Sequence, residues 1–295
     1  MITVPLSHNR SLHINTIPLV MGILNATPDS FFLESRVEPG TDAVARARAM
    51  VAAGADLLDV GGESSRPGSD YVDADEEIAR VVPVIRAIRA FSDIPISIDT
   101  RKLAVAREAV AAGADMINDI SALRDDPDLA PFAAERGLPV VLMHMRGTPR
   151  TMQQNPHYGD VVTEVLAELS AMADAAMAAG VARDRIIIDP GIGFGKRLQD
   201  NLVLLRSIER FTATGFPVLI GASRKSFIGA LAAAEGSQPR PPEERLAGTL
   251  AVHLHAAAAG AHILRVHDVA ETVQALRVSG ALERAVVQPA AGGAA

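Results

Sequence analysis

Short apolar runs in this sequence almost all end on a polar residue that could do chemistry. Residues 21–24 lead into Asn25, residues 96–98 into Asp99 and residues 186–188 into Asp189. The other runs end in the same way, at Asp59, Asn118, His144, Ser223 to Lys225, and Arg265 with His267. Carboxylate, amide and cationic side chains can bind the polar edge of a small molecule and stabilise developing charge. We therefore expect these residues to share one site.

The elements that must position these residues alternate along the chain. Between the apolar runs lie segments of helical periodicity, at 41–54, 74–90, 102–113, 127–136, 159–180, 199–214, 243–260 and 269–283. Eight buried strands that alternate with helices and end in functional groups are typical of a (β/α)8 TIM barrel, with the active site at its C-terminal mouth. The sequence therefore predicts an α/β fold of this type.

An internal repetition supports the barrel. Residues 51–60, 110–119 and 258–266 each join an Ala-rich helix end through Gly-Ala to an apolar strand, and glycine suits the left-handed conformation that ends a helix. Residues 2–16 alternate apolar and polar side chains, which predicts a small hairpin that plugs the bottom of the barrel. The expected organisation is a hairpin at 1–17, a single-domain barrel at 18–284 and a disordered Ala/Gly-rich tail at 285–295.

Composition argues against several classes of function. The chain has 295 residues, a net charge of -7 and 3% aromatic residues. Nucleic acid is therefore not an expected partner, because binding a phosphate backbone needs a basic face. The most apolar stretch, 250–266, carries three histidines and Arg265, so we expect no membrane span. The absence of cysteine fits a reducing compartment, and the first residues lack a secretory signal; we expect a cytoplasmic enzyme.

Two glycine-rich segments follow predicted strands. Asp189 begins Asp-Pro-Gly-Ile-Gly-Phe-Gly-Lys at 189–196, which is either a tight turn capped by the aspartate or a binding loop at the catalytic end of a barrel strand. Residues 59–68 carry consecutive glycines that let main-chain amides approach an anion, with Arg66 as a candidate for phosphate oxygens. The alternative for Arg66 is an ion pair with Glu63 in a solvated loop.

The basic residues at other strand ends have similar alternatives. Lys225 lies near the start of a predicted helix, where it is either a surface residue or a partner for an acceptor atom of a substrate. Arg265 and His267 point the same way from one strand end, because they are two residues apart. They could neutralise a diphosphate, or form salt links with Asp268 or Glu271.

Asp99 and Asn118 are either helix caps or site residues, since both residue types often cap helices. His144 is interpreted as a packing or supporting residue rather than as a catalyst. The spacing of His, Asp and Glu fits no fixed zinc site. The absence of a Gly-x-Ser-x-Gly elbow disfavours serine hydrolase chemistry.

Eight motifs occur in a characteristic order along the chain. They are Gly-Ile-Leu-Asn-Ala-Thr-Pro-Asp-Ser-Phe at 22–31, Asp-Val-Gly-Gly-Glu-Ser-Ser-Arg-Pro-Gly at 59–68, Ser-Ile-Asp-Thr at 97–100, Asn-Asp at 118–119, Met-His-Met at 143–145, the segment 189–196, Ser-Arg-Lys-Ser at 223–226 and Arg-Val-His-Asp at 265–268. This ordered set resembles the dihydropteroate synthase family over about residues 18–284. The resemblance implies a (β/α)8 fold and a step of folate biosynthesis. In that step (7,8-dihydropterin-6-yl)methyl diphosphate and 4-aminobenzoate give 7,8-dihydropteroate and diphosphate.

The resemblance implies roles for residues around the pterin. Asp189 would accept the 2-amino and N3 protons, and Asp99 the N8 proton. Asn118 suits the mixed edge between them, and Lys225 would donate to the O4 and N5 side. The rest of the expected pterin pocket is Met143, Gly193 and Phe194.

The resemblance also implies how the leaving group departs. The C–O bond breaks ahead of attack, because an arylamine is a weak nucleophile and the pterin can delocalise a methylene cation. The expected diphosphate ligands are Asn25, which also binds Mg²⁺, and Arg66, Arg265 and His267. The residues expected to be catalytic are Asp99, Lys225, Arg265, His267 and Arg66. Those expected around 4-aminobenzoate are Ser65, Pro67, Phe194, Lys225 and Ser226.

The family also implies a homodimer that contacts through the outer helices, with small-molecule substrates as the other partners. Two departures from the family pattern bear on 4-aminobenzoate affinity and sulfonamide sensitivity. Residues 31–35 are Phe-Phe-Leu-Glu-Ser, where the family usually has Ser-Asp-Gly-Gly after the first Phe, and Ser65 replaces a common Thr. Two rival interpretations are a methyltetrahydrofolate-binding methyltransferase, which needs no cations for diphosphate, and a non-catalytic pterin-binding paralogue.

Overall fold

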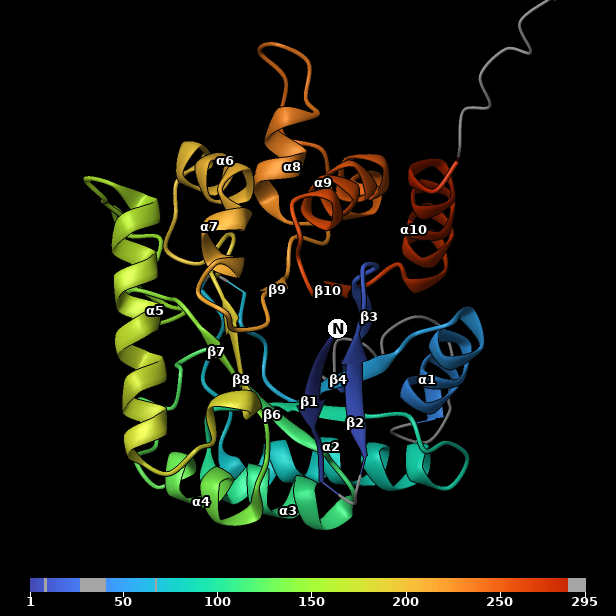
Figure 1. The fold of residues 1–295 in the computed structure, drawn as a ribbon, viewed down its shortest axis with the longest axis vertical. Helices are drawn as coiled ribbons and strands as arrows, with labels where there is room; N and C mark the ends of the chain where they lie inside the picture. Colours follow the sequence, from blue (N-terminus) through green and yellow to red (C-terminus); the bar gives the residue numbers. More distant parts are fainter. Residues whose placement is uncertain (8–9, 27–40, 67, 286–295) are drawn as a thin grey trace, which may run out of the picture.

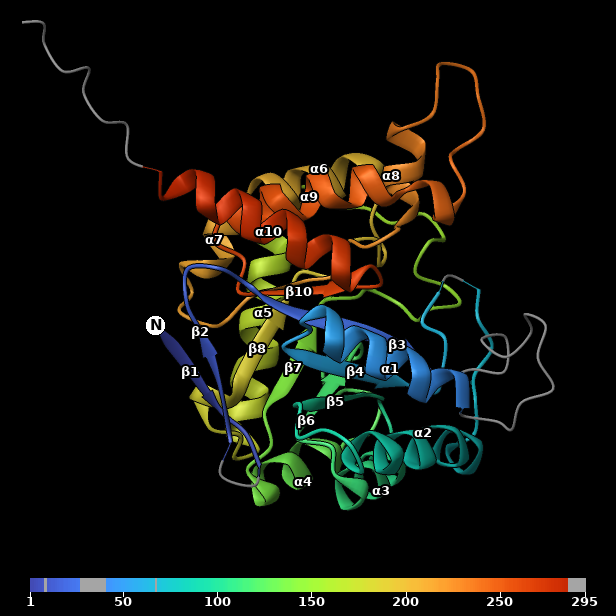
Figure 2. The same cartoon turned by 90° about the vertical axis from the view of Figure 1, so that its right-hand side faces the viewer.

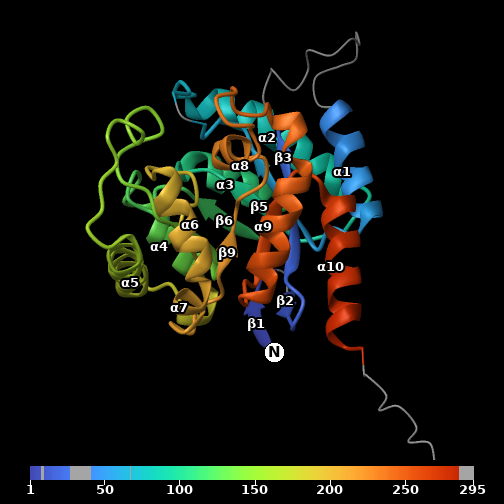
Figure 3. The same cartoon turned by 90° about the horizontal axis from the view of Figure 1, so that it is seen from above.

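Eight parallel strands form the centre of the molecule. The computed structural model describes residues 1–7, 10–26, 41–66 and 68–285. The strands are β3 (Leu19–Asn25), β4 (Leu57–Gly61), β5 (Ile96–Asp99), β6 (Met116–Asp119), β7 (Val140–Met143), β8 (Ile186–Asp189), β9 (Leu219–Ile220) and β10 (Ile263–Val266). Their order in the sheet is β8-β7-β6-β5-β4-β3-β10-β9, and a bridge between Ile188 and Val218 joins the two outer strands. The predicted barrel is confirmed (Figures 1 and 3).

Helices surround this sheet, on the side of each strand that faces away from the barrel axis (Figure 3). They are α1 (Thr41–Ala53), α2 (Ala74–Arg89), α3 (Leu103–Ala112), α4 (Leu129–Arg136), α5 (Val161–Ala178), α6 (Leu198–Arg206), α7 (Ile208–Thr212), α8 (Ser226–Leu231), α9 (Leu246–Ala258) and α10 (Val269–Glu283), with 3-10 turns at Arg183–Arg185 and Pro242–Glu244. Among the described residues, no helix combines the length and the apolar character that crossing a membrane requires.

One detail of the helices differs from the prediction. The single helix expected at 199–214 is divided into α6 and α7 at Ser207, whose φ of -108° and ψ of 20° leave the helical range. The helix expected to open near Lys225 is present as α8, which begins at Ser226.

The strands bury two different faces. Outward side chains, such as Leu58, Ile98 and Leu264, belong to the large apolar core that includes the helices. A second apolar cluster contains inward residues from seven strands: Met21, Leu57, Met116, Val141, Ile187, Leu219 and Ile263. Because side chains alternate along a strand, these residues form the lowest inward layer of the barrel.

An antiparallel hairpin closes the barrel beneath this layer. Strand β1 (Ile2–Pro5) pairs with β2 (Ser11–Ile14), with Ile2 opposite Ile14. The hairpin places four buried side chains in the same cluster as the lowest layer: Val4, Leu6, Leu12 and Ile14. Figure 2 shows the hairpin at one end of the barrel. The predicted plug is therefore present, whereas residues 286–295 of the predicted tail lie outside the described residues.

One buried carboxylate ties the hairpin to the barrel. Asp115, just before β6, is fully buried and accepts hydrogen bonds from the Ile96 amide at 2.9 Å and the Ser7 hydroxyl at 3.1 Å. It also forms ion pairs with Arg10 of the hairpin and, at 2.6 Å, with Arg89 of α2. Burying a carboxylate is favourable only when its charge and lone pairs are satisfied in this way.

We predict that Asp115→Ala lowers the free energy of unfolding by about 3 kcal/mol, because it leaves two guanidinium groups without their buried partner. Urea unfolding measures the change. Glu244→Ala is the control, since Glu244 and its partner Arg240 are both about half exposed, and its effect should stay below about 0.5 kcal/mol. Equal effects of the two substitutions would contradict the anchoring role of Asp115.

Candidate functional site

The second inward layer, above the apolar one, contains several polar side chains. Four of its residues lie two positions beyond a residue of the lowest layer and therefore face the same way: Asp59 after Leu57, Asn118 after Met116, Asp189 after Ile187 and Arg265 after Ile263. Asp99, at the end of β5, is aligned with Gly61 on one side and with Asn118 on the other. The fold thus brings together residues that are far apart in the sequence.

Arg265 is the centre of this layer. Its Nε donates to Asp59 Oδ2 at 2.6 Å and its Nη2 donates to Asp99 Oδ2 at 2.7 Å. The Nδ2 of Asn118 donates to the same Asp59 oxygen at 3.0 Å. The alternative salt link to Asp268 is wrong for Arg265, because Asp268 instead pairs with Arg224, whose Nε lies 2.9 Å away.

Asp99 is a member of this layer and not a helix cap. The N-cap residue of α3 is Lys102, and the amide of Leu103 donates to Asp126 at 2.8 Å. Burial raises the pKa of Asp99 to about 8, against the opposing attraction of Arg265. The guanidinium stays charged at this depth, because its intrinsic pKa is so high. Burial therefore favours proton uptake by Asp99, and the contact with Arg265 opposes it.

Asp189 and Lys225 form a second pair of charges. Asp189 Oδ1 accepts from the Gly191 amide at 2.7 Å, so the aspartate also caps the turn that follows it. Burial raises the pKa of Asp189, with Lys225 opposing the shift. Burial lowers the pKa of Lys225 to about 7, and here Asp189 opposes the shift.

The glycines of the 189–196 segment allow Lys225 to approach. The Nζ of Lys225, at the N-cap position of α8, donates to the Ile192 carbonyl and lies 4.2 Å from the centre of the Phe194 ring. Gly193 has φ +81°, and a Cβ there would lie 2.8 Å from Lys225 Cδ. Only glycine meets both demands at this position. A Cβ at Gly221 would lie 3.9 Å from Arg265 Cβ and 4.0 Å from Asp189 Oδ2, so the backbone of Gly221 lies beside both residues.

An apolar wall adjoins these charges. Met143, Met145 and Met152 form a small buried cluster, against which Ile120 and Phe194 pack. Methionine and phenylalanine side chains suit the face of a flat ring, while the polar layer suits its edge. The arrangement fits a polar heteroaromatic ring.

His267 lies among the cations of the mouth. Its Nδ1 is 3.0 Å from the hydroxyl of Ser223. Burial, together with the nearby charges of Arg265, Arg224 and Arg66, lowers the pKa of His267 to about 3. The imidazole is therefore neutral in the free chain, although the sequence suggested it as a cation for diphosphate. A bound anion would raise this pKa.

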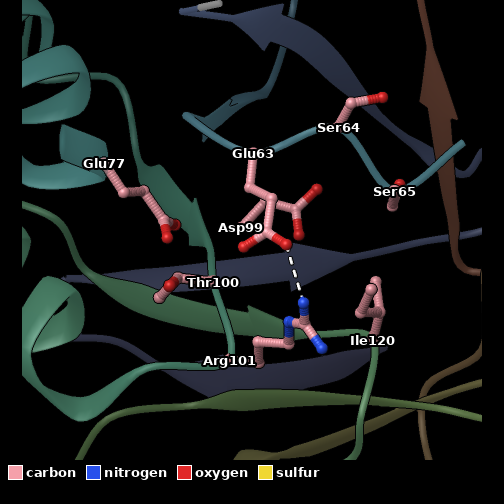
Figure 4. Close-up of a pocket in the computed structure, with 8 residues that line it drawn as sticks. All are labelled: Glu63, Ser64, Ser65, Glu77, Asp99, Thr100, Arg101 and Ile120. Carbon is pink, nitrogen blue, oxygen red and sulfur yellow. Dashed lines mark hydrogen bonds and ion pairs between the residues drawn. The ribbon is translucent and has the colours of Figure 1, made fainter. Parts of the chain in front are cut away.

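The loop that follows β4 is held by Glu63, and not by an Arg66–Glu63 ion pair. Glu63 pairs with Arg101 at 2.7 Å and with Lys102, which leaves the exposed Arg66 for another anion. Glu63 and its neighbour Ser65 line a small cavity together with Asp99 (Figure 4). The loop is thereby fixed beside the polar layer.

The remaining predicted residues are placed less fully. Asn25 ends β3 opposite Gly61, whose other neighbour is Asp99. Ser226 is exposed at the first position of α8. Pro67 and the unusual residues 31–35 lie outside the described residues. Within the described ranges, no group of three or more His, Cys, Asp or Glu could hold a metal ion.

Sequence reasoning placed Asp59 among the strand-end residues of the site but gave it no role of its own, and it missed a supporting network behind the pocket. His144 is fully buried, with Nε2 3.0 Å from Glu168 and Nδ1 3.0 Å from Lys196. Lys196 also donates to the carbonyl of Phe194 at 3.0 Å, so this network supports the 189–196 segment from below. Nothing in the sequence linked Lys196 to His144.

Comparisons with known proteins agree with this geometry. Residues 21–267 match a family described as pterin binding enzyme. The dihydropteroate synthase of Escherichia coli (strain K12) is 48% identical over 261 residues, which cover 88% of this chain and 90% of that protein. The dihydropteroate synthase of a Synechocystis species is 47% identical over 265 residues, or 90% of each chain.

Solved structures extend the likeness to the whole fold. The Xanthomonas albilineans dihydropteroate synthase with 4-aminobenzoic acid has a TM-score of 0.88 and 46% identity, and the alignment covers 96% of this chain and 100% of that one. The same enzyme in complex with 7,8-dihydropteroate has a TM-score of 0.86 and 44% identity, with the same coverage. The chain described here belongs to the dihydropteroate synthase family of pterin-binding enzymes.

Proposed function

We propose that the polar layer, the apolar wall and the loop after β4 each contact a different part of the substrates in the dihydropteroate synthase reaction. As a member of this family, the chain is a transferase that joins the pterin methylene group to 4-aminobenzoate in folate biosynthesis. The observation that carries the division of roles is the buried Asp59–Arg265–Asp99 arrangement with Asn118, opposite Asp189 and Lys225. It supplies acceptors, donors and positive charge at one end of the barrel interior.

The pterin is proposed to lie edge-on against the polar layer, with its face on Met143 and Phe194. Asp189 would accept the 2-amino and N3 protons, and Asn118 would contact the mixed edge. Asp99 would accept the N8 proton and Lys225 would donate to O4 and N5. Gly193 serves by leaving room for Lys225. This assignment is supported by the burial of Asp189 and Asn118 and the partial burial of Asp99 and Lys225, because hydrogen bonds to charged groups are strongest away from water.

The diphosphate is proposed to leave toward Arg66, Arg265 and His267. Positive charge fixed in advance where negative charge develops lowers the barrier to C–O cleavage. Asp99, close to Arg265, would stabilise the methylene cation that forms as the bond breaks. The neutral His267 would donate a hydrogen bond to a phosphate oxygen, and it would gain a proton as its pKa rises beside the anion.

Mg²⁺ fits this site only as an ion that binds with the diphosphate. Magnesium is commonly held by one or two protein oxygens together with substrate phosphates. Asn25 offers such an oxygen at the mouth, and the described residues contain no acidic or histidine cluster that could hold the ion alone. When bound, the ion would withdraw charge from the departing oxygens.

4-Aminobenzoate is proposed to bind above the pterin, between Phe194, Lys225 and Ser226 on one side and Ser65 and Pro67 on the other. Ser65 lines the cavity beside Asp99, which supports this position. We further propose that sulfonamides inhibit the enzyme, that it forms a homodimer through the outer helices, and that it is located in the cytoplasm.

The reaction itself is tested with purified protein, dihydropterin-methyl diphosphate and Mg²⁺. We expect diphosphate release that depends on 4-aminobenzoate and matches dihydropteroate formation. Tight pterin binding without product would indicate a non-catalytic paralogue. An absence of pterin binding would contradict the proposed site.

We predict that Asp189→Asn weakens binding of the bare pterin by about 1.5–3 kcal/mol, roughly 10- to 100-fold, because it removes a charged acceptor. Titration calorimetry measures the affinity. Asp160→Asn, at the exposed N-cap of α5, is the matched control and should stay within about twofold of wild type. An unchanged affinity in Asp189→Asn would remove Asp189 from the site.

We predict that the contribution of Lys225 to pterin binding depends on pH. Its pKa is lowered to about 7, so the side chain is charged below this pH and loses its charge above it. The affinity advantage of wild type over Lys225→Met should therefore be largest at about pH 6 and shrink toward about pH 9. Both proteins are titrated at each pH, so that any effect of ligand ionisation is the same for the two and cancels in the comparison. A constant advantage would show that Lys225 does not titrate there.

A further inference from the structure

Asp59 is a buried carboxylate of the site to which the proposed reaction gives no substrate contact. Its exposed fraction is 0%. One oxygen, Oδ2, accepts from both Arg265 and Asn118, while Oδ1 is buried and has no hydrogen-bond partner among the described residues. A buried charge with an unused oxygen is costly. Its retention therefore calls for a role.

The first effect of Asp59 is on the orientation of Asn118. An amide presents a donor on one side and an acceptor on the other, whereas an ionised carboxylate only accepts. With Nδ2 of Asn118 donating to Asp59 at 3.0 Å, the Asn118 carbonyl oxygen is left for other partners. The opposite orientation would place two oxygens in contact. Asp59 thus determines that Asn118 offers an acceptor.

The second effect is on Arg265. A guanidinium has five N–H donors in a rigid plane. Asp59 takes the Nε donor and Asp99 takes one donor of Nη2, so two fixed points set the plane of the group. The Nη1 edge then remains for an anion. Without Asp59, Asp99 alone would leave the plane free to rotate.

We propose that Asp59 is a positioning residue that fixes the acceptor side of Asn118 for the pterin and the free edge of Arg265 for the diphosphate. This inference rests on the proposed function, because it takes the roles of Asn118 and Arg265 from there. Asp59 contacts neither substrate in this scheme. It acts on pterin affinity through Asn118 and on turnover through Arg265.

Asp59→Asn tests the proposal, since it keeps the shape and removes the charge. An asparagine at 59 can donate as well as accept, so Asn118 becomes free to turn over. We expect the affinity for bare pterin to fall about 10-fold, the effect of one lost hydrogen bond to a buried group. We expect kcat at saturating substrates to fall by a further 10-fold or so, because Arg265 keeps only one charged partner and its plane is held less firmly. Unchanged affinity and kcat would overturn the proposal.

Ser97→Ala is the matched control. Ser97 lies beside Asp59 in the strand register, is fully buried, and its hydroxyl has no partner among the described residues. Its replacement disturbs the same layer without touching Asn118 or Arg265. Both kinetic constants should stay within about twofold of wild type. Losses as large as those of Asp59→Asn would overturn the specific role, because any change in the layer would then suffice.

A double-mutant cycle separates positioning from a direct contact. In an Asn118→Ala background, Asp59→Asn should change pterin affinity by less than about twofold, because the group through which it acts is gone. Full additivity would overturn the proposal. If Asn118→Ala alone leaves pterin affinity intact, the proposed function of the site fails instead, so the two failures are distinguishable.

Thermal unfolding of each variant is measured alongside. A neutral side chain is easier to bury than a carboxylate, and Arg265 retains Asp99, so Asp59→Asn should fold. Asp59→Ser is a second neutral variant that leaves the Arg265 pocket less crowded, and it should lose affinity and kcat in the same way. A lower melting temperature with wild-type affinity and kcat would reduce Asp59 to a structural role and overturn the proposal.

Discussion

The contact of Arg265 with two carboxylates is the constraint on which the rest of the site depends. Arg265 lies inside the barrel, where a single charge would be very costly. Asp59 and Asp99 compensate it at 2.6 and 2.7 Å, and Asn118 satisfies a further lone pair. Each of these groups compensates a charge or a lone pair of another. The burial of each of these polar residues therefore depends on its hydrogen-bond partners in the same layer.

The two-residue period of the strands places this polar layer directly above the apolar one. The lowest inward side chains are apolar and seal against the hairpin. Two residues further, four of the strands present polar inward side chains, namely Asp59, Asn118, Asp189 and Arg265. The same strands thus hold the core together and present the chemistry. The outward side chains, in between, pack against the helices. Stability and function are separated by position along the strand.

The sequence was sufficient for the barrel, the hairpin plug and most of the polar layer, because these follow from local patterns with a fixed period. It was insufficient wherever a side chain chooses between partners that are distant in the chain. Arg265 pairs with Asp59 across 206 positions, while the nearby Asp268 goes to Arg224. Glu63 likewise prefers Arg101 and Lys102 on the next strand end to Arg66 in its own loop. The local sequence around Asp99 fits both a helix cap and a site residue, and only the inward position of Asp99 in the fold identifies it as a site residue.

The hairpin beneath the barrel determines how ligands enter and leave the site. Val4, Leu6, Leu12 and Ile14 close the lower end, so ligands reach the polar layer through the opening at the upper end, where the strands terminate. If the pterin occupies the polar floor and 4-aminobenzoate lies above it, as proposed, the lower ligand must enter first. The joined product must leave through the same opening, in one piece, before a new cycle can start. A ligand held at the rim therefore controls access to everything beneath it.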